Sequence, residues 1–136
     1  MPGSQPVMAA VSRTPGVPAT GTAGYRKGTS MSRGFGLVVR FTARDLDAVR
    51  GFDDLVRRTV TGIREREPGT LAYVVHSVRE EPLVRVFYEL YADRDAFEAH
   101  EQQPHTKLFL AERHRYLAAT EVTFLNAEFG RGPAQA

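Results

Sequence analysis

The groups best suited to proton transfer near neutral pH are the four histidines of the sequence, which are His76, His100, His105 and His114. Imidazole has an ordinary pKa close to neutrality, so a histidine that lines a pocket can act as a general base. The spacings between these histidines match no metal-binding motif, and the chain contains no cysteine. The histidines are therefore candidates for acid–base chemistry, and no metal site is predicted.

His100 is the histidine best placed for this role. Asp93 is a residue type that caps helices, and Phe97, His100 and Glu101 follow it at the spacing of one helical face. The imidazole should therefore point into the space between the helices and a sheet. It is predicted to be either a general base or a hydrogen-bonded core histidine.

His105 is predicted to lie at the start of a second helix, because Pro104 fits a first helical turn and disfavours helix in the residue before it. The helix dipole disfavours protonation at that position, which suits a neutral base or a polar pocket wall. The alternative for His105 is exposure to water. His114 falls off the apolar stripe of the same helix and is expected in solvent.

The surroundings of His76 depend on how its strand pairs with the next strand, since a slip of one residue exchanges the faces. In one register His76 joins Arg85, Glu89 and Tyr91 in a charged cluster, either a dimer-interface network or part of a pocket. In the other register it faces an apolar set that includes Val84. The sequence leaves the register open, and we favour the structural interpretation of the cluster.

Arg113 occupies the middle of an otherwise apolar stripe in the last predicted helix, which carries Thr106, Phe109, Leu110, Arg113, Tyr116 and Leu117. Burial of an unpaired guanidinium is costly. Arg113 therefore needs a partner, extends its charged end into solvent, or contacts a ligand.

The elements that position these residues follow the order β-α-β-β-α-β, with the second helical region broken at Pro104. Strands are predicted at residues 35–42, 71–78, 84–91 and 121–129. A helix capped by Asp45 or Asp47 carries an apolar stripe of Val49, Phe52, Val56, Val60 and Ile63. This order predicts an α+β, ferredoxin-like fold: a four-stranded antiparallel sheet with helices on one face.

Two features of the first long helix are expected to be structural only. The run Arg64-Glu65-Arg66-Glu67 is interpreted as a solvated helix end before the turn at Pro68-Gly69, and not as a site. Gly51 and Gly62 are expected to weaken the helix by about 1 kcal/mol each relative to alanine.

Apolar residues on both faces of the first three strands predict a homodimer, because the helices of one chain can cover only one face of the sheet. Two sheets packed face to face would form a dimeric α+β barrel.

Composition sets the domain boundaries. Residues 1–34 are rich in Gly, Pro, Ser, Thr and Ala and are expected to be a disordered tail, or to precede a true start at Met31. Residues 35–129 form the predicted domain, and residues 130–136 a flexible C-terminus. The tail holds four basic residues and no acid, so the remainder, with 14 basic and 16 acidic residues, is mildly acidic. We expect neither nucleic-acid binding nor membrane insertion. We expect a cytoplasmic location.

The runs FYELY, AFEAH and QQPHTKLFL, preceded by EREPGTLAYVVH, resemble the antibiotic biosynthesis monooxygenase family, whose members form dimeric α+β barrels. The resemblance spans residues 35–129. Its most specific pieces are Glu67-Pro68-Gly69-Thr70, Tyr88-Glu89, and His100 with Pro104-His105.

The resemblance implies an enzyme, a monooxygenase that acts without a cofactor on a small electron-rich aromatic (a quinol, phenol or polyketide anthrone) and O₂. His100, His105 and His76 are the candidate catalytic residues. The candidate substrate-binding residues are Tyr73, Tyr88, Glu89, Phe97, Phe109 and Arg113. Haem degradation is disfavoured, because family members that degrade haem use a tryptophan and an asparagine, and this chain has no Trp and only Asn126. An isomerase of a small metabolite and a non-catalytic ligand-binding dimer are the alternatives.

Overall fold

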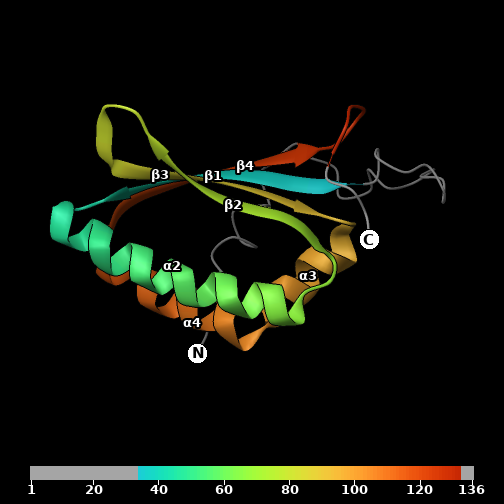
Figure 1. The fold of residues 1–136 in the computed structure, drawn as a ribbon, viewed down its shortest axis with the longest axis horizontal. Helices are drawn as coiled ribbons and strands as arrows, with labels where there is room; N and C mark the ends of the chain where they lie inside the picture. The colour runs from blue at the N-terminus through green and yellow to red at the C-terminus, as the bar shows by residue number, and fades with distance from the viewer. Residues whose placement is uncertain (1–33, 133–136) are drawn as a thin grey trace.

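The computed structural model describes residues 34–132. A four-stranded antiparallel sheet in the order β2-β3-β1-β4 forms one layer, and the helices cover one of its faces (Figure 1). The elements are β1 (Phe35–Ala43), α2 (Leu46–Arg66), β2 (Thr70–Val78), β3 (Glu81–Tyr91), α3 (Arg94–Gln102), α4 (Pro104–Glu112), the 3-10 turn η3 (Arg113–Arg115) and β4 (Leu117–Asn126). The predicted ferredoxin-like α+β fold is confirmed. The expectations of a tail and of a start at Met31 fall almost entirely on residues 1–33, outside the described residues, as do residues 133–136.

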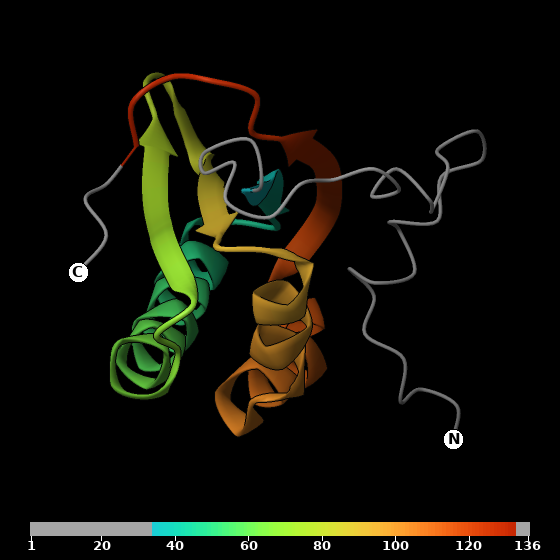
Figure 2. The same cartoon turned by 90° about the vertical axis from the view of Figure 1, so that its right-hand side faces the viewer.

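Capping side chains and a proline set the ends of the helices. The side chains of Asp45 and Asp93 each accept a hydrogen bond from the backbone three residues on, at 2.8 Å, and so cap α2 and α3. Gln103 is extended between α3 and α4 because it precedes Pro104, the first residue of α4. Figure 2 shows α2 beneath β2, and α3 and α4, which follow one another along the chain, beneath the other half of the sheet.

The pairing of β2 with β3 settles the register that the sequence left open. Tyr73 lies opposite Glu89, whereas His76 lies opposite Val86 and Val74 lies opposite Tyr88. Residues directly opposite each other share a face, so His76 and Tyr88 point away from the helices. The cluster of His76 with Glu89, one of the two alternatives left open, is therefore not formed, and the expectation that Tyr88 lines a pocket beside Tyr73 is wrong.

Arg85, another member of the expected cluster, has a structural partner. Its guanidinium donates two hydrogen bonds to Asp53 of α2, at 3.0 and 2.9 Å, and the two side chains are mostly buried. This fork-shaped ion pair joins β3 to α2. Arg85 is thus used in packing and does not reach the histidines.

The last helix is shorter than predicted. α4 ends at Glu112, η3 follows, and β4 begins at Leu117 and not at residue 121. The spacing of Tyr116 and Leu117 suits a helix, but both residues continue the apolar surface after the chain has turned back to the sheet. None of the described helices is long and apolar enough to cross a membrane.

The face of the sheet opposite the helices carries apolar side chains. Val74 is 45% exposed and Tyr88 36% exposed on this face. Val38 and Val86 share it, as the strand pairings show. On the helix-bearing face, Leu37, Val39 and Phe87 are fully buried in the core. The two-sided strands expected from the sequence are therefore present.

Candidate functional site

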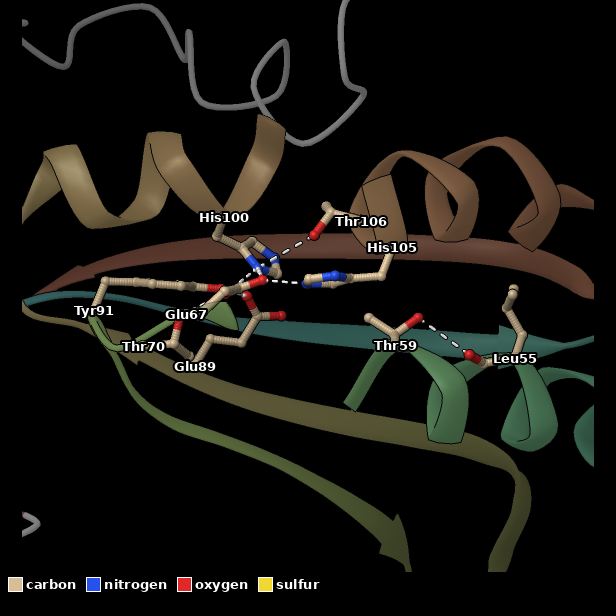
Figure 3. Close-up of polar contacts among 9 residues, drawn as sticks. All are labelled: Leu55, Thr59, Glu67, Thr70, Glu89, Tyr91, His100, His105 and Thr106. Atoms are coloured by element: carbon tan, nitrogen blue, oxygen red, sulfur yellow. Dashed lines mark hydrogen bonds and ion pairs between the residues drawn. The ribbon is translucent and has the colours of Figure 1, made fainter. Parts of the chain in front are cut away.

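A buried carboxylate, that of Glu67, lies at the centre of the polar groups between the sheet and the helices (Figure 3). His100 Nδ1 lies 2.8 and 3.1 Å from its two oxygens, and His105 Nε2 contacts Oε2. Thr70 donates its hydroxyl to Oε1 at 2.6 Å. These donors come from α3, α4 and β2, so Glu67 joins the end of α2 to three other elements.

The local sequence brings Glu67 inward. Pro68 disfavours helix at Glu67, which caps α2 and donates its backbone N–H to Ile63. Gly69 then packs against α3, where an added Cβ would lie 2.7 Å from that of Ala96. The turn therefore brings Glu67 under His100.

The interpretation of the whole charge run as a solvated helix end is wrong for its last member. Arg64, Glu65 and Arg66 are exposed, but Glu67 is only 8% exposed. A signal for this was present, because Glu67 follows Ile63 by four residues and so continues the apolar stripe of the helix.

The electrostatics keep Glu67 ionised. Burial by itself would raise the pKa of this carboxyl, but the hydrogen bond and positive charge of His100 act against it, as do the hydrogen bonds of Thr70 and His105. The net result lowers the pKa from 4.5 to about 2. A fixed negative charge therefore faces two imidazoles at neutral pH.

The carboxylate of Glu67 fixes the orientation of the His100 ring. His100 is 3% exposed, and its hydrogen bonds among the described residues all involve Nδ1, with Glu67 and, at 3.4 Å, with Thr106. When His100 is neutral, Nδ1 carries the proton that it shares with the carboxylate, and Nε2 is left as a base. A carboxylate behind an imidazole fixes the tautomer and stabilises the positive charge gained on accepting a proton.

His105 reaches the same carboxylate because α2 has no side chain at Gly62. A Cβ on that residue would lie 2.3 Å from Nδ1 of His105. The position expected only to weaken the helix is thus a point of close approach between α2 and α4. The alternative considered for His105 was exposure to water. This alternative is wrong, since the ring is largely buried.

A second polar layer lies on the sheet beside the histidines. Tyr91 donates its hydroxyl to Glu89 at 2.6 Å, and Glu89 is fully buried with no partner for Oε2 among the described residues. Burial raises the pKa of Glu89. The rings of Tyr73 and Tyr91 lie 5.7 and 5.2 Å from that of His100. The site thus combines a charged carboxylate, two imidazoles and a carboxyl that burial biases toward its neutral form.

The other residues singled out in the sequence lie in different surroundings. Phe97 packs 5.3 Å from the ring of Tyr91 and flanks the site, while Phe109 lies deeper, in the core around Phe87. Arg113 is buried, and Nη1 has no hydrogen-bond partner in the described part of the chain. His114 is exposed, as predicted. Residues 34–132 contain no group of three or more potential ligands arranged to hold a metal ion.

A cleft of about 300 Å³ opens between the C-terminal half of α2 and the edge strand β2. Its walls are Val60, Ile63, Arg64, Glu67, Pro68, Thr70, Leu71, Ala72 and Tyr73. Glu67 and Tyr73, which both adjoin His100, form part of its wall, whereas the two imidazoles do not line it. Its volume is at the lower end of the range of about 300–1,000 Å³ for small-molecule sites.

The strand order and the one-sided helices define a ferredoxin-like α+β protein, and the polar groups between its layers are of the types used in acid–base chemistry. Within this class, residues 35–112 match the antibiotic biosynthesis monooxygenase family, which is more than half of the chain. The chain belongs to this family, and the resemblance found in the sequence is confirmed.

Solved structures share the fold. A protein from Caulobacter crescentus superposes with a TM-score of 0.66 at 23% identity, over 72% of this chain and 92% of its own. PA3566 from Pseudomonas aeruginosa superposes with a TM-score of 0.64 at 24% identity, over 71% of this chain and 95% of its own. Rv0793 from Mycobacterium tuberculosis superposes with a TM-score of 0.62 at 26% identity, over 68% of this chain and 92% of its own. No curated protein matches the chain in sequence.

We predict that Gly62→Ala destabilises the protein even though alanine favours helix by about 1 kcal/mol, because the added methyl group displaces His105. In a His105→Ala background the same change should cost less or become stabilising. Chemical denaturation of the four proteins measures this coupling, expected at about 0.5–3 kcal/mol. Additive effects would contradict the contact.

We also predict that Glu101→Gln stabilises the protein above pH 7 and has little effect below pH 4.5. Burial raises the pKa of Glu101 from 4.5 to about 7. The unfolded chain therefore ionises first, and the parent loses stability as the pH rises through this window. Melting temperatures across the range measure the difference. Glu65→Gln, exposed at the end of α2, is the control, and parallel curves for Glu101→Gln and the parent would contradict the prediction.

Proposed function

We propose that this protein is a cofactor-independent monooxygenase that acts on a small electron-rich aromatic compound of the quinol or phenol type. The observation that carries the proposal is the contact of the buried, ionised Glu67 with His100 Nδ1. This contact leaves Nε2 available to remove a proton from a phenolic hydroxyl. Membership of the antibiotic biosynthesis monooxygenase family supports the reaction class.

In this proposal the chain's own groups do three things. His100 accepts the phenolic proton while Glu67 stabilises the imidazolium, and the substrate anion becomes electron-rich enough to react with O₂. The rings of Tyr73, Tyr91 and Phe97 surround His100 and exclude water. His105 holds the second oxygen of Glu67 and so positions the carboxylate.

The overall reaction needs no external reductant. A quinol and O₂ give a hydroxylated quinone and water: one oxygen atom enters the ring and the other is reduced to water. Oxidation of the quinol and of one ring C–H bond supplies the four electrons that O₂ accepts. The two protons of the water come from the substrate, one of them by way of His100.

We expect oxygen consumption when the purified protein receives a hydroquinone in the presence of a metal chelator. His100→Ala should slow turnover by at least about tenfold, the low end for loss of a general base. His114→Ala, an exposed histidine, is the matched control and should keep the parent rate. Full activity of a folded His100→Ala variant would show that His100 is not the general base and that another residue must have this role. No oxygen uptake with any quinol, phenol or anthrone would favour an isomerase or a binding protein.

The proposal includes a homodimer in which the uncovered sheet faces of two chains meet. Support comes from the apolar side chains on that face, with Val74 and Tyr88 partly exposed in a single chain. Sedimentation at micromolar concentration should give twice the monomer mass, and Val74→Asp should shift the equilibrium toward monomer. An exposed substitution on the helical side, Glu98→Gln, should not. A stable parent monomer would contradict the dimer.

A further inference from the structure

Arg113 holds a buried positive charge for which the described residues provide no acid. The side chain is 6% exposed, no ion pair involves it, and Nη1 makes no hydrogen bond within residues 34–132. Burying a guanidinium without a partner is among the more destabilising arrangements in a protein. An unpaired group of this kind is expected where a ligand completes the hydrogen bonding.

The position of Arg113 in the chain directs it toward the site. Thr106, Phe109 and Arg113 follow one another on one face of α4 and its 3-10 extension, and all three are buried. Thr106 Oγ1 lies 3.4 Å from His100 Nδ1. Helical side chains tend to lean toward the N-terminus of their helix, which on this face is the end that carries Thr106.

Tyr73 connects Arg113 with His100. Its ring centre lies 5.7 Å from that of His100 and 5.7 Å from that of Phe87, against which Phe109 also packs. Burial and the charge of Glu89 raise the pKa of Tyr73, and the charge of Arg113 acts in the opposite direction. Tyr73 therefore packs beside His100 and lies within electrostatic range of Arg113.

We propose that Arg113 binds the oxygen anion of the aromatic substrate beside Tyr73, an inference that rests on the proposed function. Removal of a proton at His100 leaves a phenolate in a largely buried space. The buried acidic groups that interact electrostatically with His100 are Glu67 from the end of α2, Glu89 from β3 and Glu101 from α3. These carboxyl groups repel an anion when they are charged, and the imidazoles of His100 and His105 are already bound to Glu67. The guanidinium supplies the missing positive charge and a free N–H.

The test uses 4-nitrophenol, whose neutral and anionic forms have different visible spectra, so absorbance reports the ionisation of the bound molecule without any reaction with O₂. We expect the parent protein to bind it mainly as the anion, with a pKa lowered by about one unit or more. Arg113→Met keeps the length and the apolar stem of the side chain but removes the charge. It should weaken binding of the anion by about tenfold or more.

Two further measurements separate a ligand-binding role from a structural one. Without ligand, Arg113→Met should melt at or above the parent temperature, because an unpaired buried charge is replaced by an apolar group. Arg113→Lys keeps the charge and should retain part of the pKa shift. Arg115→Met, whose parent residue is exposed and paired with Glu112, is the matched control and should bind like the parent.

The outcomes for Arg113 and for the oxygenase can be told apart. Oxygen uptake from a quinol together with unchanged nitrophenolate binding by Arg113→Met would overturn the role of Arg113 and keep the oxygenase. Anion binding that depends on Arg113, without oxygen uptake from any quinol, would keep the binding role and remove the oxygenase. Absence of nitrophenolate binding by the parent, or a markedly lower melting temperature of Arg113→Met, would overturn the inference.

Discussion

The site depends on the need of one buried carboxylate to be neutralised. An ionised Glu67 inside the protein would be strongly unfavourable without donors, and the protein supplies them from three separate elements. His100 comes from α3, His105 from α4 and Thr70 from the start of β2. The same contacts that make burial of the charge tolerable also fix the positions and tautomers of the two imidazoles. The contacts that stabilise the fold here therefore also orient the two imidazoles.

Some buried charged groups of the protein are fully hydrogen-bonded, and others are not. The Asp53–Arg85 pair is complete, with two hydrogen bonds between the charged groups, and it holds α2 against β3. Glu89, Glu101 and Arg113 each retain a buried atom without a partner in the described chain. Unsatisfied atoms of this kind lower stability, so a protein that only needed to fold would gain from their replacement. These three groups are therefore the ones to explain by something other than the stability of the fold.

Helix propensity and packing oppose each other along α2. Glycine is unfavourable inside a helix, yet Gly51 and Gly62 both lie where another part of the chain comes close. An added Cβ at Gly51 would lie 2.4 Å from the ring of Tyr116, and one at Gly62 would meet the ring of His105. The loss in helix propensity is therefore the condition for close packing of α2 on α4 and η3, and for the reach of His105 to Glu67.

Local patterns in the sequence determined the order of the elements, the caps at Asp45 and Asp93, the break at Pro104 and the inward direction of His100, because each follows from the geometry of a few neighbouring residues. Tertiary structure alone decided which residues meet. The pairing of β2 with β3 placed His76 on the face away from the site and Tyr73 beside Glu89, a choice that a slip of one residue would reverse. The turn after α2 brought Glu67 to two histidines more than 30 positions away in the chain. Contacts over such separations depend on how whole elements pack, which short-range residue spacing does not encode.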